Sequence, residues 1–148
     1  ALTKELELEE FIKFAGMVEP KEVKKYYQVG DVFVCASTSE TQGLTYIEAA
    51  ASGLPLICRK DPCLYGVLEE GGNGYSYSDI YRFAKYVREY VKDEAWLQTS
   101  GEHSRWIAKN YGTEMFGQKV FGIYKAASWK GVLDYESVTV CEKSANRI

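Results

Sequence analysis

The chain has 148 residues, of which 46% are hydrophobic and 26% charged, and this suffices for a domain with a buried core. A formal net charge of −3 argues against a large nucleic-acid-binding surface, and no apolar run is long enough to cross a bilayer. The four cysteines form neither a Cys-x-x-Cys pair nor a disulfide framework, which favours a reducing, cytoplasmic compartment.

The beginning of the chain reads as the interior of a longer protein. There is no initiator Met, and the apolar run at residues 11–15 predicts an internal strand. A helix should follow, opened by Pro20, ended by Gly30 and carrying Tyr26 and Tyr27 in its apolar stripe. We therefore expect an N-terminally truncated fold that opens with a strand and a short helix.

Apolar runs and helical segments then alternate. The runs at 32–36 and 55–58 are nearly continuous, which predicts strands covered on both faces, as in a parallel sheet. Residues 43–52 predict a helix between them, ended by a Gly-Leu-Pro stop, and residues 75–77 predict a short further strand. This alternation predicts an α/β fold with a doubly wound parallel sheet, in which ligands bind at the carboxyl ends of the strands.

The remainder is predicted to be helical. Apolar residues recur at helical spacing from Ile80 onward, and Ser78 or Asp79 should cap that helix. Asp93 is expected to cap a second helix that runs to about residue 110, and Thr113 a third. The pattern assigns no structure to the tail at 129–148.

The most informative segment holds two glutamates, Glu40 and Glu48, separated by seven residues. Between them a glycine turn leads from a strand into a helix. The unpaired N–H groups at the start of such a helix, with the positive end of its dipole, form an anion site. Two carboxylates beside that site are placed to accept hydrogen bonds from hydroxyl groups. Phosphate together with hydroxyls suggests a sugar nucleotide.

Helix capping is the alternative explanation of both glutamates. Residues 37–40 and 45–48 each match the Ser/Thr-x-x-Glu pattern of a capping box. Spacing alone does not separate capping from ligand binding. His103 is the sole histidine and falls in a late helix, where we expect a surface or packing role, and no residue cluster has metal-ligand spacing.

Residues 39–55 resemble the Glu-x7-Glu signature of the retaining glycosyltransferases of family 4, which have two Rossmann-like domains (the GT-B fold). The resemblance continues in the family's order through three further segments, at 14–18, 29–34 and 72–75. It implies that residues 1–128 are part of the C-terminal, donor-binding domain, with 129–148 as a tail. A narrower resemblance, in residues 39–45 and 60–67, is to bacterial diacylglycerol glucosyltransferases.

The resemblance assigns a role to each matching residue. Glu40 would contact hydroxyls of the donor sugar in the catalytic site, and Glu48 would hold the ribose hydroxyls. The remaining donor-binding positions are the turn amides of Gln42, Gly43 and Leu44, the N–H and hydroxyl of Thr45, and the nucleobase border at Met17 and Val18. For Met17, a place in the core is an equally good explanation.

The implied reaction is transfer of a hexosyl group from a UDP-hexose, with UDP-glucose expected, to a hydroxyl acceptor such as a diacylglycerol or glycolipid, with retention of configuration. We expect no cofactor or metal beyond the donor substrate. The family's basic clamp and acceptor domain lie upstream of this sequence, so the chain alone should not turn over. The whole enzyme would work at the cytoplasmic face of the membrane, and an exposed sheet edge predicts self-association.

Two alternatives belong to other functional classes. A two-domain sugar-nucleotide epimerase would share the fold, but that family relies on a histidine near the donor, and none is close to Glu40 in the sequence. A non-catalytic α/β interaction module would use both glutamates only as helix caps.

Overall fold

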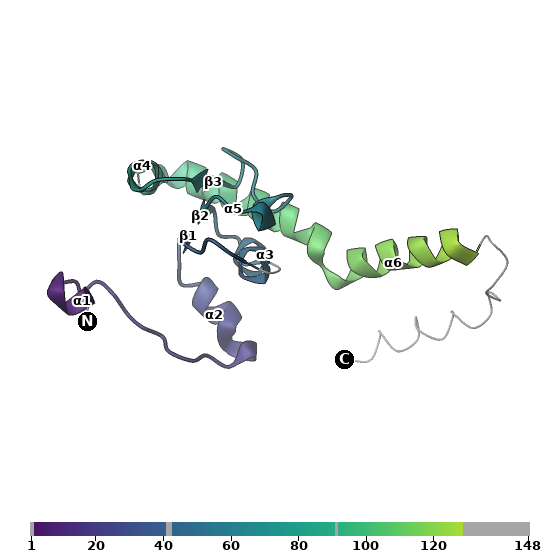
Figure 1. The fold of residues 1–148 in the computed structure, drawn as a ribbon, viewed down its shortest axis with the longest axis horizontal. Coiled ribbons are helices and arrows are strands. Elements are labelled where there is room, and N and C mark those ends of the chain that lie inside the picture. Colours follow the sequence, from purple (N-terminus) through teal and green to yellow (C-terminus); the bar gives the residue numbers. More distant parts are fainter. Residues whose placement is uncertain (1, 41–42, 91, 129–148) are drawn as a thin grey trace. The chain divides into compact units, whose positions relative to one another are not determined.

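The computed structural model describes residues 2–40, 43–90 and 92–128 (Figure 1). The chain divides into two compact units, 1–109 and 110–148, which are described separately. The first contains, in order, α1 (Leu2–Glu5), η1 (Pro20–Glu22), α2 (Val23–Tyr27), β1 (Phe33–Cys35), α3 (Leu44–Ala51), β2 (Leu56–Arg59), η2 (Pro62–Leu64), β3 (Gly74–Tyr77), α4 (Ile80–Tyr90) and α5 (Glu94–Ala108). The short helix η3 (Lys109–Tyr111) spans the boundary, and α6 (Thr113–Ser128) lies in the second unit. The predicted tail at 129–148 lies outside the described residues.

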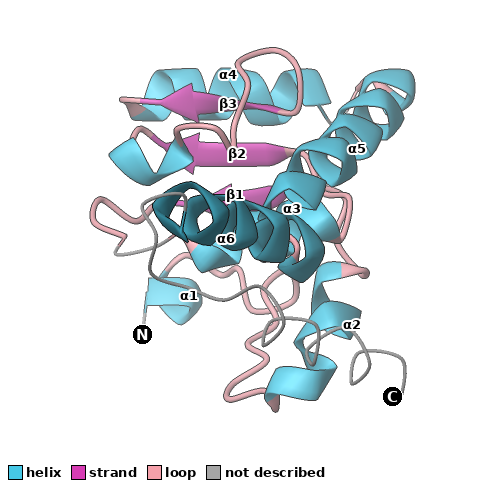
Figure 2. Cartoon of the chain, turned by 90° about the vertical axis from the view of Figure 1, so that its right-hand side faces the viewer, coloured by secondary structure: helices cyan, strands magenta, loops and turns pink. Residues whose placement is uncertain are grey.

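The sheet of the first unit is parallel and follows the order β1-β2-β3 (Figure 2). Phe33 lies opposite Leu56 and Cys35 opposite Cys58, while Leu56 also pairs with Gly74 on the other side. All three predicted strands from the middle of the chain are therefore confirmed to within a residue or two. Their carboxyl ends meet at one edge of the sheet.

Both faces of β2 are buried. Leu56 and Cys58 pack on one face against Tyr46 and other α3 residues. Ile57 points to the opposite face, where it packs against a cluster formed by β3, α4 and α5. Helices cover both faces, so the predicted doubly wound α/β architecture is confirmed.

The strand predicted at 11–15 is wrong. Phe11 and Phe14 are about four-fifths exposed, and the segment joins no strand among the described residues. The backbone N–H groups of Phe11 and Ile12 instead bond to the carbonyl oxygen of Leu8 in a local turn. A strand needs a neighbouring strand for its backbone groups, and this segment has none within the described chain.

Two of the predicted helix caps are confirmed. Asp79, and not Ser78, accepts from the N–H groups of Tyr81 and Arg82, at 3.1 and 2.9 Å. Asp93 likewise accepts from the N–H of Trp96 at 2.9 Å. Thr113, by contrast, is the first residue of α6, whose hydrogen bonding already starts from the carbonyl of Gly112.

Helix α5 packs against the turn that follows α3, and Gly101 of α5 lies at this contact. A Cβ atom there would collide with the carbonyl oxygen of Gly53. One turn later the fully buried Ser104 hydroxyl donates to the carbonyl oxygen of Leu54 at 2.7 Å. This close contact fixes the carboxyl end of α3 and the start of β2 against α5.

The Gly101→Ala variant should therefore be destabilised. The added methyl group meets backbone that cannot move aside, so we expect unfolding to become easier by about 2 kcal/mol. Thermal or urea unfolding measures the change. The matched control is Gly117→Ala in α6, where the new Cβ would have no described atom within 4 Å apart from its chain neighbours and its own helix backbone. That change should stabilise its helix by about 0.5–1 kcal/mol. Equal midpoints for wild type and Gly101→Ala would contradict the contact.

Candidate functional site

The loops that follow β1 and β2 meet at the carboxyl edge of the sheet. The Cys63 thiol, in η2 after β2, donates to the backbone oxygen of Glu40 at 3.1 Å. The backbone N–H of Cys63 is held in turn by the Asp61 carboxylate at 2.8 Å. From β3, the Tyr77 hydroxyl donates to the carbonyl oxygen of Cys35 at the end of β1, at 3.2 Å. The edge is thus tied together by contacts from all three strands.

Gly43 connects this edge to α3. It is the N-cap of the helix and has a φ of 62°, in the left-handed region that favours glycine. A Cβ atom would lie 3.1 Å from the Tyr46 ring and 3.2 Å from the Cys63 Cβ. A side chain at this position would therefore meet the Tyr46 ring and the loop after β2, which favours glycine here.

The first turn of α3 offers unpaired donors. The N–H groups of Tyr46 and Ile47 bond to the carbonyl oxygen of Gly43, at 3.0 and 3.3 Å. Those of Leu44 and Thr45 have no hydrogen-bond partner among the described residues, and both residues are exposed. This is the arrangement that binds anions at helix N-termini.

Neither glutamate is part of a capping box. Helix α3 begins at Leu44, so Thr45 is its second residue and cannot be the N-cap, while Glu48 lies in the second turn. The actual N-cap, Gly43, has no side-chain capping bond. Glu40 belongs to the loop before α3, and no helix begins at residues 37–40. The capping alternative is wrong for both residues.

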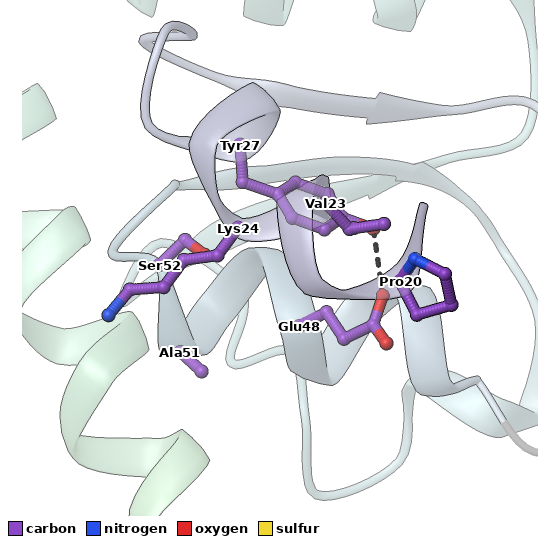
Figure 3. A pocket seen from close by; sticks show the side chains of 7 residues that line it. All are labelled: Pro20, Val23, Lys24, Tyr27, Glu48, Ala51 and Ser52. Atoms are coloured by element: carbon purple, nitrogen blue, oxygen red, sulfur yellow. Dashed lines mark hydrogen bonds between the residues drawn. The ribbon is translucent and has the colours of Figure 1, made fainter. Parts of the chain in front are cut away.

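Glu48 instead lines an open pocket of about 370 Å³ between α2 and α3 (Figure 3). The pocket wall is formed by Pro20, Val23, Lys24, Tyr27, Glu48, Ala51 and Ser52. The Tyr27 hydroxyl donates to Oε2 of Glu48 at 3.1 Å, shown as the dashed line in Figure 3. Partial burial, with the negative charge of Glu48 and this hydrogen bond, raises the pKa of Tyr27 from 10.0 to about 12.

The sequence pattern predicts Tyr27 in an apolar stripe but not its contact with Glu48. The stripe itself is confirmed, because the ring packs on Phe33 of β1 with centroids 5.9 Å apart. Phe33 in turn meets Tyr46 of α3 edge-on at 6.3 Å. No local signal could have revealed the hydroxyl contact, since it joins residues that are 21 positions apart.

The other predicted site residues make no described hydrogen bond to the Glu40–Glu48 segment or lie outside the described residues. Met17 is fully exposed, so its alternative place in the core is wrong, and Val18 is half-buried. Within the described chain, neither makes a hydrogen bond to the Glu40–Glu48 segment. Gln42 lies outside the described residues. Two exposed cations that were not among the predicted site residues, Arg59 at the end of β2 and Lys60 directly after it, lie at the edge where Glu40 lies.

The fold and site define an α/β domain that presents a helix N-terminus at the carboxyl edge of a parallel sheet, with two glutamates that cap no helix: Glu40 in the loop before α3 and Glu48 in its second turn. The family described as Glycosyl transferases group 1 matches residues 1–112. The chain belongs to this glycosyltransferase family, and the predicted resemblance is confirmed at that level.

Curated relatives include two alpha-monoglucosyldiacylglycerol synthases. The protein from Acholeplasma laidlawii is 35% identical over 114 residues, covering 77% of this chain and 29% of that protein. The one from Streptococcus pneumoniae is 34% identical over 122 residues, covering 80% and 26%. The chain thus spans less than a third of the length of these relatives. They confirm the narrower resemblance to diacylglycerol glucosyltransferases.

Solved structures of GT-B glycosyltransferases share the fold. Sucrose-phosphate synthase from Thermosynechococcus elongatus superposes with a TM-score of 0.71 at 26% identity, over 88% of this chain and 33% of that one. The pneumococcal O-GlcNAc transferase GtfA, solved in complex with UDP and GlcNAc, gives 0.67 at 28% identity, over 84% and 26%. None of the helices in the described residues is long and apolar enough to span a membrane.

The contact between Tyr27 and Glu48 predicts how Tyr27 titrates. Its raised pKa means that the unfolded chain loses this proton first, so stability should fall as the pH rises from 10.0 to about 12. Titration of ¹³Cζ-labelled tyrosine by NMR should give a Tyr27 midpoint near 12, lower in Glu48→Gln. Glu102→Gln on α5 is the control and should leave the midpoint unchanged. An identical midpoint in Glu48→Gln would contradict the contact.

Proposed function

We propose that this chain is the donor-binding part of a retaining glycosyltransferase that uses a UDP-hexose, with UDP-glucose as the favoured donor. The observation that carries the proposal is the β1–α3 connection, where exposed N–H groups of Leu44 and Thr45 adjoin two glutamates that cap no helix. Phosphate oxygens suit the N–H groups, and sugar hydroxyls suit the carboxylates. Membership of the glycosyltransferase family supports this pairing.

Each residue then has a defined task. The first turn of α3, with the amide of Gln42, receives the diphosphate, and its positive dipole stabilises the leaving group electrostatically without a bound metal. Glu40 orients the donor sugar and does not act as the nucleophile. Glu48 holds the ribose hydroxyls, and Met17 and Val18 border the nucleobase. The leaving diphosphate helps to deprotonate the acceptor hydroxyl on the same face, which retains the configuration.

The acceptor is proposed to be the hydroxyl of a diacylglycerol or glycolipid. The support comes from the relatives, since two of them are named as alpha-monoglucosyldiacylglycerol synthases. Such an enzyme would work at the cytoplasmic face of the membrane, with a separate acceptor domain. Within the described residues β1 pairs only with β2, which supports the expected self-association of the chain through its other edge.

Two observations count against the alternatives. The interaction-module hypothesis required both glutamates to be helix caps, and α3 is capped by Gly43. The epimerase hypothesis needed a histidine at the donor, whereas His103 lies on α5 and bonds to Glu69 at 2.7 Å.

Titration of the chain with UDP, followed by amide NMR, tests donor binding. We expect saturable shifts in the amide signals of Met17, Gly43, Leu44 and Thr45. Glu48→Gln should weaken the affinity for UDP by about tenfold or more, because a charged acceptor for the ribose hydroxyls is lost. Glu102→Gln, which changes an exposed carboxylate on α5 away from the β1–α3 connection, is the control and should bind as wild type. Binding that is insensitive to Glu48→Gln would refute the assigned role of Glu48.

The chain alone should bind its donor without transferring sugar. The curated relatives are more than three times as long as the matched segment, and the acceptor domain and basic clamp are expected outside this sequence. Incubation with UDP-[¹⁴C]glucose and diacylglycerol vesicles should give no labelled lipid. Detectable transfer by the purified chain would overturn this expectation.

A further inference from the structure

The hydrogen bond between Tyr27 and Glu48 joins the two walls of the pocket in Figure 3. It runs from the hydroxyl of the last residue of α2 to a carboxylate on the exposed side of α3, at 3.1 Å. Nothing in the backbone geometry requires this contact, since α2 and α3 are separate elements connected through β1. The hydrogen bond therefore restricts the side-chain conformation of Glu48.

An exposed glutamate on a helix otherwise samples several rotamers, and ordering it on ligand binding costs entropy. Tyr27 is a suitable partner because a tyrosine has few rotatable bonds and its ring is packed. Here the ring lies against Phe33 of β1, which itself contacts Tyr46 of α3. The hydroxyl is thus held by the same packing that fixes α3 to the sheet.

The contact also leaves the carboxylate chemically available. Tyr27 engages Oε2, and in the described part of the chain no other group bonds to Glu48. Lys24 lines the same pocket but forms no ion pair with Glu48 among the described residues. A neutral phenol therefore orients the carboxylate without neutralising it, and the second oxygen remains open to accept from a ligand.

We propose that Tyr27 is a positioning residue, which holds the Glu48 carboxylate in the orientation that accepts hydrogen bonds from the ribose hydroxyls of the donor. This inference rests on the proposed function. Tyr27 acts only through Glu48 and contributes to the choice of a ribonucleotide over its 2′-deoxy analogue.

The experiment compares the affinities of the 148-residue chain for UDP and 2′-deoxy-UDP by calorimetric titration. The variants are Tyr27→Phe, Glu48→Gln and the double variant. The control is Tyr26→Phe, which removes a hydroxyl from the neighbouring residue of α2, whose side chain makes no hydrogen bond within the described chain. Thermal unfolding of each variant verifies that it is folded at the temperature of the titration.

We expect Tyr27→Phe to weaken UDP binding by about fivefold to tenfold, the usual net worth of one hydrogen bond, and 2′-deoxy-UDP binding by less. Tyr26→Phe should bind as wild type. In the Glu48→Gln background, Tyr27→Phe should have little further effect, because its contribution passes through the carboxylate.

Failure of the inference and failure of the proposed function give different results. If Glu48→Gln reduces the preference for UDP over 2′-deoxy-UDP but Tyr27→Phe does not, Tyr27 is not a positioning residue, although the donor site stands. If Tyr27→Phe and Tyr26→Phe weaken both ligands equally, the effect is one of stability and the inference is also overturned. If the wild-type chain binds neither nucleotide, the proposed function fails and the inference falls with it.

Discussion

The structure depends on the burial of one short strand on both of its faces. Leu56 and Cys58 of β2 pack toward α3, and Ile57 packs toward α4 and α5, so that helices must cover both sides. At about 25 cal/mol per Å² of apolar surface removed from water, such burial is the main stabilising term available to a sheet of this size. It also fixes the register, because a shift by one residue would exchange the two faces.

Fixed register has a direct consequence for the site. Parallel strands end at the same edge, so the loop after β1 and the loop after β2 are brought together there, where Cys63 meets both Glu40 and Gly43. The sharp left-handed turn at Gly43 then sets the direction of α3. The position of the free N–H groups of this first turn beside Glu40 is therefore set by the sheet topology. In an isolated helix the same N–H groups would have no fixed relation to Glu40.

Local signals carried most of the sequence-based prediction. The apolar runs identified three strands, and the side chains of Asp79 and Asp93 cap helices only two or three residues away. The prediction at 11–15 was wrong because an apolar run shows only that a segment can form a strand, while a strand exists only where a partner strand is present. The bond between Tyr27 and Glu48 was inaccessible for a related reason, since it depends on how α2 and α3 pack.

The position of Glu48 is itself an argument for ligand binding. A carboxylate that served the helix would be expected in the first turn of α3, near the positive end of the dipole, and one that served stability would be expected beside a cation. Glu48 lies in the second turn, and its hydrogen-bond partner in the described chain is a neutral phenol. A neutral donor directs the carboxylate but does not satisfy its charge. The arrangement therefore leaves acceptor capacity that a hydroxyl-bearing ligand can use, which agrees with the proposed donor site.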